Sequence, residues 1–245
     1  MDVLLVDAAL ALAVLGCACF VRPLPSFGVG TRRRGALLAL AGFGLLLVGL
    51  LLPVSPPRLS GPRMAIDEVL PDYQFGEVHE TLVRASPERV LEAAEAVTAG
   101  EIRFFRLLTW LRSPRLGRGR ESILHAPADE PLLQVALRSG FLRLREDPGH
   151  EIVFGSVVCC DLARRPRDAS EFGALQGSLA RAVMNFHVEA LGPAESRLVT
   201  ETRVAASDAR AERRFAVYWR LIYPGSAFIR RMWLRAIKAR AEAAR

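Results

Sequence analysis

The sequence predicts an α+β protein in which a curved antiparallel sheet is followed by one long C-terminal helix, with two transmembrane helices before this domain. Three observations favour this architecture. They are two nearly uncharged hydrophobic runs, short β-rich segments separated by turn residues, and an amphipathic C-terminal segment with helical periodicity. The length of 245 residues and the hydrophobic content of 51% allow one domain of ordinary size plus additional segments.

Two N-terminal segments predict membrane spans. Val3–Val21 contains one charged residue, Asp7, and Gly35–Pro53 contains none. About 20 apolar residues, rising ~1.5 Å each, cross the ~30 Å hydrocarbon core of a bilayer. A secretory signal is the alternative for the first run, but signals begin with a basic region and this chain begins MDVLLVD. We therefore expect a two-helix transmembrane anchor over residues 1–53.

The loop between the two runs predicts the topology. Arg22 and the segment Thr31–Arg34 supply four arginines, and positively charged loops favour the cytoplasmic side. Arg58 and Arg63 follow the second run and weigh against this orientation. The balance predicts a multi-pass cell-membrane protein, with the bilayer as a partner and an extracytoplasmic soluble domain.

A proline-rich segment predicts the domain boundary. Pro53–Arg63 contains four prolines and two serines, a composition typical of a stiff, extended linker. We assign residues 54–71 to the linker and residues 72–242 to the soluble domain.

The domain begins with a predicted strand, Tyr73–Ala85, which is rich in β-forming residues. A helix follows, with Ser86 as its N-cap and Pro87 at its first position. Pro131–Gly140 predicts a short helix that is closed by glycine.

Two turn signals predict antiparallel hairpins. Asp147–Gly149 and Gly192–Pro193 are each flanked by β-rich segments. A long helix then begins near Asp208, and Pro224–Gly225 predicts a kink or a break in it, which could act as a hinge.

Short phrases of this domain resemble a known superfamily. Val83–Ala93 (VRASPERVLEA) resembles the first strand-to-helix junction of the SRPBCC, or START-like, helix-grip superfamily, and the phrases MNFHVE, VTETRV and YWRLIYPGSAFIRRMWLRAI look like an uncharacterised bacterial subgroup of it. The resemblance covers about Asp72–Arg240. It implies a sheet that grips the terminal helix around an apolar cavity. It implies no fixed catalytic residue, because members include lipid-transfer domains, polyketide cyclases and pollen allergens.

Residues on two kinds of element are candidates for lining such a cavity. On the terminal helix the candidates share one face at spacings i, i+3, i+4 and i+7, which also suits simple core packing. On the strands the candidates are an aromatic residue and three hydroxyl residues. The ligand-binding candidates are Phe154, Ser156, Thr200, Thr202, Phe215, Tyr218, Trp219 and Ile222.

Catalytic and metal-binding signatures are absent from the sequence. There is no phosphate-binding glycine loop, no nucleophile elbow and no H-E-x-x-H motif, because His79-Glu80 continues as Thr-Leu-Val. The four cysteines lack zinc-site spacing, so we expect no metal and no cofactor. Catalytic residues are unknown. Alternation along the strands predicts that Asn185, His187, Glu201 and Arg203 lie on the outer face of the sheet.

Charge distribution argues against nucleic-acid binding. The net charge is +7, but residues 64–207 are net −4, and the net positive charge lies at the two ends of the chain. The leading hypothesis is a membrane-tethered START-like domain that binds a hydrophobic or lipid-like molecule under the C-terminal helix. The alternatives are an enzyme of the cyclase or dehydratase type and a non-catalytic envelope scaffold that binds a partner. Oligomeric state stays open.

Overall fold

The structure is a computed structural model that describes residues 2–25, 28–51, 64–112, 123–158 and 166–243. Two compact units make up the chain, and each is described by itself. Unit 1 comprises Met1–Ser55 and Ala216–Pro224, and unit 2 comprises Pro56–Phe215 and Gly225–Arg245.

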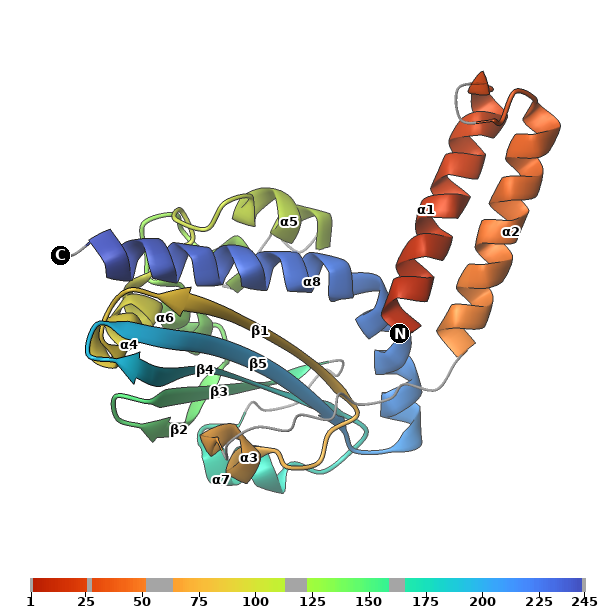
Figure 1. Cartoon of the computed structure of the whole chain (residues 1–245). Coiled ribbons are helices and arrows are strands. Elements are labelled where there is room, and N and C mark those ends of the chain that lie inside the picture. Colours follow the sequence, from red (N-terminus) through yellow and green to blue (C-terminus); the bar gives the residue numbers. More distant parts are fainter. Residues whose placement is uncertain (1, 26–27, 52–63, 113–122, 159–165, 244–245) are drawn as a thin grey trace. The chain divides into compact units, whose positions relative to one another are not determined.

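A five-stranded antiparallel sheet forms the centre of unit 2 (Figure 1). Its spatial order is β1-β5-β4-β3-β2. The two hairpins place β2 beside β3 and β4 beside β5, and β1 forms the edge next to β5. The predicted α+β class with an antiparallel sheet and a C-terminal helix is therefore confirmed. The strands are β1 (Phe75–Val83), β2 (Leu142–Asp147), β3 (Glu151–Val158), β4 (Ala180–Gly192) and β5 (Glu195–Ala206).

Both predicted hairpin turns are confirmed. The β2–β3 turn contains Gly149 with a φ of 79°, a left-handed conformation that glycine adopts without the steric penalty of a Cβ atom. In the β4–β5 hairpin, Gly192 pairs with Glu195 across the turn.

Helices of unit 2 cover the inner face of the sheet, which we define as the face towards α8. The predicted helix after β1 is α4 (Pro87–Ala96), with Ser86 in the N-cap position and Pro87 opening the first turn. The predicted short helix is α6 (Leu132–Arg138), and α5 (Phe105–Arg112) lies between them in the chain. Residues of α8 from Gly225 onward run along the sheet (Figure 1).

The main core lies between the inner face and these helices. Phe186 of β4 and Trp233 of α8 meet edge to face, with ring centroids 5.1 Å apart. Burial of such aromatic side chains is a large favourable contribution to folding. Other buried members of this core come from three helices and four strands: Val83, Val90, Ala94, Leu132, Val135, Ile152, Phe154, Met184, Val188, Leu198, Met232 and Ile237.

The outer face of the sheet is also covered. The short helices α3 (Ala65–Val69) and α7 (Ala169–Ala174) lie against it, with α3 inside the segment that we assigned to the linker. They form a second core of Ile66, Leu70, Val153, Phe172, Val183 and Ala205. Central strands are therefore buried on both faces, which the sequence analysis did not anticipate. Residues 54–63 of the predicted linker lie outside the described residues.

The terminal helix α8 (Ala209–Ala243) begins after Asp208, whose Oδ1 accepts hydrogen bonds from Arg210 N at 2.8 Å and Ala211 N at 2.7 Å. Such capping satisfies amides that have no partner within the helix. The chain remains helical across Pro224, so of the two predicted alternatives the break is wrong and the kink stays a prediction.

Unit 1 contains an α-helical hairpin. The helices α1 (Asp2–Val21) and α2 (Arg32–Leu51) pack through small residues, among them the buried Ala13. A Cβ atom added at Gly16 would lie 2.2 Å from Ala39 N, and one at Gly42 would lie 2.4 Å from Ala13 N. The two backbones therefore approach so closely that only glycine fits at these points.

The predictions of two transmembrane helices and of a multi-pass membrane location are wrong. Among the residues that the structure describes, no helix combines the length and the apolar content needed to cross a membrane. The prediction considered only the uncharged run Gly35–Pro53. The helix α2 begins earlier, at Arg32, and includes three arginines in its first turn. Similarly, α1 includes Asp2 and Asp7. The prediction of an extracytoplasmic soluble domain depended on these two spans, so it no longer has a basis.

Gly42→Ala is expected to weaken the α1–α2 contact, because the added methyl group overlaps the backbone of α1 and overpacking costs about 1–3 kcal/mol. Hydrogen exchange measured by mass spectrometry should show faster exchange in α1 peptides. Gly44→Ala is the matched control, because a Cβ atom at Gly44 meets nothing within 4 Å. Equal protection of α1 in the two variants would contradict the close approach.

Candidate functional site

Polar side chains interrupt the apolar inner face of the sheet along one row that crosses four strands. Strand register places Glu77 of β1 opposite Thr202 of β5, Thr202 opposite Met184 of β4, and Met184 opposite Phe154 of β3. Paired residues on one face lie about 4.5–5.5 Å apart, so these four side chains are lateral neighbours. One pair further along β1, His79 lies opposite Thr200.

Glu77 is the central acidic group of this row. It is 3% exposed, and its Oε1 accepts a hydrogen bond from Ser226 Oγ at 2.8 Å. Arg230 Nε lies 3.8 Å from the same oxygen. Ser226 and Arg230 are four residues apart on α8 and therefore share one helix face. One oxygen of the carboxylate is thus held from the helix side.

Arg230 reaches from Glu77 towards β4. Its Nη1 and Nη2 lie 3.3 and 3.4 Å from Met184 Sδ, and its Cζ lies 5.5 Å from the centre of the Trp233 ring. Since Thr202 lies between Glu77 and Met184 in the sheet, the Arg230 side chain spans the position above Thr202. Glu77, Thr202, Met184 and Trp233 therefore gather around one guanidinium group.

Polar atoms in this group are left without hydrogen-bond partners. Within the described part of the chain, no hydrogen bond is made by Glu77 Oε2, His79 Nε2, Thr202 Oγ1 or Trp233 Nε1, all of which are buried. The first two lie 3.5 Å apart, without hydrogen-bond geometry. Buried polar groups are paired in most proteins, and an unpaired one costs about 1–3 kcal/mol. Glu77, His79, Thr202 and Trp233 contribute one such atom each. We call this group the inner polar cluster and take it as a candidate binding site.

The structure divides the predicted ligand-binding residues between the two units. Phe154, Thr200 and Thr202 lie in or beside the inner polar cluster. Ser156 lies further along β3 and donates to Gly140 O at 3.3 Å, and Phe215 packs edge to face on Phe75 at 4.9 Å. The remaining three, Tyr218, Trp219 and Ile222, belong to unit 1, where Trp219 and Tyr223 form an edge-to-face pair. Ligand binding by these eight residues stays a prediction.

Sequence analysis missed Glu77, His79, Ser226, Arg230 and Trp233 as site residues. A signal for the first two was present. Phe75, Glu77, His79, Thr81 and Val83 alternate along β1, so two ionisable residues interrupt a stripe that starts and ends with a fully buried apolar side chain. No comparable signal distinguishes Arg230 from the other arginines of α8, because only the packed helix shows which of them faces the sheet.

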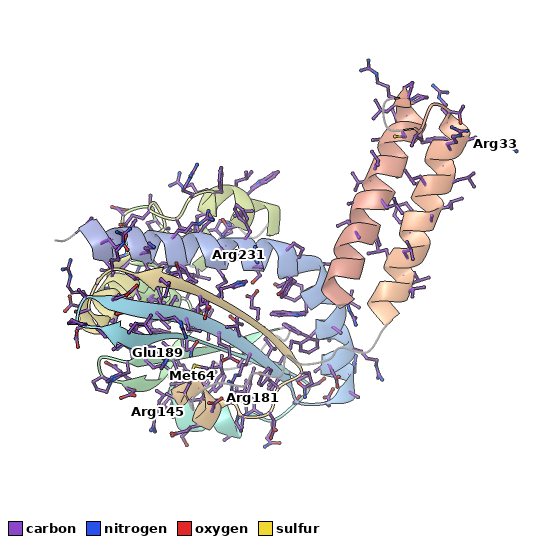
Figure 2. All side chains as sticks on the ribbon, in the orientation of Figure 1. Arg33, Met64, Arg145, Arg181, Glu189 and Arg231 are labelled. Atoms are coloured by element: carbon purple, nitrogen blue, oxygen red, sulfur yellow. The ribbon has the colours of Figure 1, made fainter. Side chains whose placement is uncertain are left out.

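The outer face holds a second polar network, which is centred on Glu151. Its Oε2 accepts from Ala65 N at 2.7 Å, and its Oε1 accepts from Ile66 N at 3.1 Å and from Asn185 Nδ2 at 2.7 Å. His187 Nδ1 lies 3.3 Å from Oε2. The carboxylate therefore caps the first turn of α3 and fastens that helix to the sheet. Figure 2 shows Met64, which precedes α3, on the outer side of the sheet.

An ion-pair network continues this outer-face cluster. Arg203 donates to Glu201 Oε1 at 2.6 Å, to Asp67 Oδ1 at 2.6 Å and to Leu70 O at 3.1 Å. Its guanidinium also lies 4.8 Å from the centre of the Tyr73 ring. Asn185 connects the two halves, because its Oδ1 accepts from Glu201 N at 2.7 Å.

Burial and neighbouring charges shift two carboxyl pKa values in opposite directions. Burial by itself raises the pKa of Glu151, but hydrogen bonds from His187, Asn185 and the α3 amides outweigh it and hold this pKa below its ordinary value. Burial also raises the pKa of Glu201, and there it prevails over the opposing effect of Arg203.

The outer network lies on the face that the alternation predicted. Asn185, Glu201 and Arg203 face away from α8, and they are also buried, because α3 covers them. Most of their polar atoms have partners within the protein, so the network fastens α3 and offers little to a ligand. The inner polar cluster is the better candidate site.

Metal chemistry finds no support in the described ranges, which contain no group of three or more His, Cys, Asp or Glu residues able to hold an ion. Cys17 and Cys19 are free thiols, the first exposed and the second buried. Cys159 and Cys160 lie outside the described residues.

Comparisons with known proteins add little. No protein-family model matches the chain, and no curated protein matches it. The crystal structure of TTHA0849 from Thermus thermophilus is similar over 69% of this chain and 98% of its own, with 12% sequence identity and a TM-score of 0.28. Such a low score supports no argument about this chain, and membership of the SRPBCC superfamily is not shown.

Thr202→Val is expected to stabilise the ligand-free protein by about 1 kcal/mol, because it removes an unpaired buried hydroxyl while preserving shape. Thr200→Val should instead destabilise it by about 1 kcal/mol, because Thr200 Oγ1 donates to Asn185 O at 2.7 Å. Urea unfolding of both variants measures the difference. Equal effects would show that Thr202 has a partner, such as a buried water molecule.

Glu151→Gln is expected to lower the free energy of unfolding at pH 7 by about 2–4 kcal/mol, because it removes the charge that caps α3. The lowered pKa means that the contribution is present above the ordinary glutamate pKa and is lost as pH falls through the folded-state value. Urea unfolding at pH 7 and in the acid range should therefore show the two proteins converging at low pH. Glu189→Gln, in an exposed pair with Arg197, is the control and should change little.

Proposed function

We propose that unit 2 is a binding domain for a small organic molecule that has an apolar body and a polar head. In this proposal the molecule lies between the inner face of the sheet and α8. The observation that supports it is the inner polar cluster, in which four buried polar atoms of the described chain lack hydrogen-bond partners. A bound head group would supply those partners and offset the cost of burying them.

The surroundings of the inner polar cluster suit an apolar body. Met184 and Phe154 continue its row across the sheet, and the Phe186–Trp233 pair lies beside it. Small-molecule sites in proteins combine such apolar walls with a few polar groups that fix orientation. Methionine adds a flexible side chain that can adapt to a ligand.

The buried state of the cluster sets a condition for binding. Trp233 is 4% exposed and Thr202 is 9% exposed, so a ligand reaches them only if α8 or neighbouring side chains move aside. The contacts of Arg230 include Glu77, the Met184 sulfur and the Trp233 ring.

A START-like identity for unit 2 is part of this proposal. The long C-terminal helix along a curved antiparallel sheet supports it (Figure 1), and the apolar cavity that the resemblance implied stays a prediction. The proposal includes no membrane anchor.

An enzyme of the cyclase or dehydratase type is the second candidate, because one observation favours it. Glu77 and His79 place a carboxylate and an imidazole 3.5 Å apart on the inner face, and such pairs can transfer protons to and from a bound substrate.

Native mass spectrometry of the full chain, purified from a bacterial host, tests the binding proposal. We expect a reproducible bound small molecule that is lost or reduced in Trp233→Phe, which removes the indole donor, and is retained in Trp110→Phe, because Trp110 is 59% exposed on α5. A chain mass without bound molecules, together with unchanged stability of Trp233→Phe, would reject the proposal.

The same experiment separates the two candidates. The released molecule is incubated with fresh protein and its mass is followed. An unchanged mass supports a binding domain. Conversion by the natural protein, lost in both Glu77→Gln and His79→Gln, would identify an enzyme.

A further inference from the structure

We propose that the head group recognised by the inner polar cluster is a neutral hydroxyl, and that the ligand is an aromatic alcohol of the phenol class. This inference rests on the proposed function, since it specifies the ligand of the same site. It follows from counting which unpaired atoms donate hydrogen bonds, which accept them, and how the nearby charges balance.

The unpaired atoms require a head group that both donates and accepts. Trp233 Nε1 can only donate, so it needs an acceptor. Glu77 Oε2 is a carboxylate oxygen and needs a donor. Thr202 Oγ1 can do either and lies beside Glu77 in the sheet. A hydroxyl group donates once and accepts up to twice, which matches three of the four unpaired atoms: one carboxylate oxygen, one indole N–H and one threonine hydroxyl. The fourth atom, His79 Nε2, lies 3.5 Å from Glu77 Oε2.

Charge balance excludes ionic head groups. Arg230 Nε lies 3.8 Å from Glu77 Oε1, so the two charges of this buried pair already compensate each other. A carboxylate or phosphate head would lie against the free oxygen of Glu77, and like charges repel strongly in a buried site. An ammonium head could donate to Glu77 but could not accept from Trp233 Nε1. An anion would also lose its hydration without a compensating partner.

Aromatic neighbours favour an aromatic body. Phe154, Met184, Phe186 and Trp233 all belong to the main core, in which Phe186 packs edge to face on Trp233. Aromatic rings pack edge to face on one another, and sulfur adds favourable contacts with ring edges. A planar ring that carries its hydroxyl directly satisfies both requirements with few rotatable bonds, so little conformational entropy is lost on binding.

Three probes with the same ring system test the head-group requirement by isothermal titration calorimetry on the full chain. 2-Naphthol can donate and accept, 2-methoxynaphthalene can only accept, and 2-naphthoate is an anion. We expect 2-naphthol to bind tightest. The methoxy compound should bind about tenfold more weakly, because it leaves Glu77 Oε2 unpaired, and naphthoate should bind more weakly still.

Glu77→Gln should reduce the preference for 2-naphthol over 2-naphthoate by about tenfold or more, because it removes the charge that repels the anion. Glu80→Gln is the matched control: it is the same substitution on the same strand, at an exposed position, and should leave all three affinities unchanged. Trp233→Phe, which keeps an aromatic ring, should weaken both 2-naphthol and the methoxy compound, since both accept from the indole. The probe series on the natural protein needs no variant and so does not depend on their folding.

The outcomes separate the inference from the proposed function. Equal affinities for the three probes, insensitive to Glu77→Gln, would overturn the hydroxyl inference while leaving a binding domain in place. Tightest binding of 2-naphthoate would overturn it in the same way. No binding of any probe would overturn the phenol class, and would reject the binding domain too if the purified chain also carries no molecule in native mass spectrometry.

Discussion

Burial of the central strands on both faces is the constraint on which the rest of unit 2 depends. With α8, α4 and α6 on one side and α3 and α7 on the other, the central residues of the middle strands β5, β4 and β3 are covered on both faces. A polar side chain buried there must find a partner inside the protein or remain unpaired at a cost in stability.

The two faces meet this constraint differently. On the outer face, Glu151, Asn185, Glu201 and Arg203 bond to one another and to the backbone of α3, so burial is compensated and a short helix is held in place. On the inner face Ser226 and Arg230 pair with only one oxygen of Glu77. This difference is the reason for assigning a structural role to the outer network and, in our proposal, ligand recognition to the inner polar cluster.

Helix α8 connects stability with the proposed function. Its residues Trp233 and Ile237 are part of the main core, whereas Ser226 and Arg230, about one to two turns earlier, supply polar contacts at the site. A movement that opens the site therefore affects the part of the helix that is held by polar contacts and a thioether, and it can leave the more C-terminal apolar part in the core.

Local sequence signals determined the elements of this protein. Alternation, turn residues and caps predicted β1, α4, α6, both hairpins and α8, because these signals depend on neighbours in the chain. They also separated the two faces of β4 and β5, and they placed Thr202 and Phe154 with the apolar side.

These local signals failed where the outcome depends on contacts distant in sequence. Only tertiary structure decided that α3 covers Asn185 and Arg203, and that Arg230 among many arginines turns towards Glu77. The apolar composition of the two N-terminal runs also led to the wrong prediction of two transmembrane helices, because the helices include charged residues such as Arg32 and Asp7. Burial and charge pairing are properties of the packed molecule, so the sequence determined the faces of each element, and packing decided what each face meets.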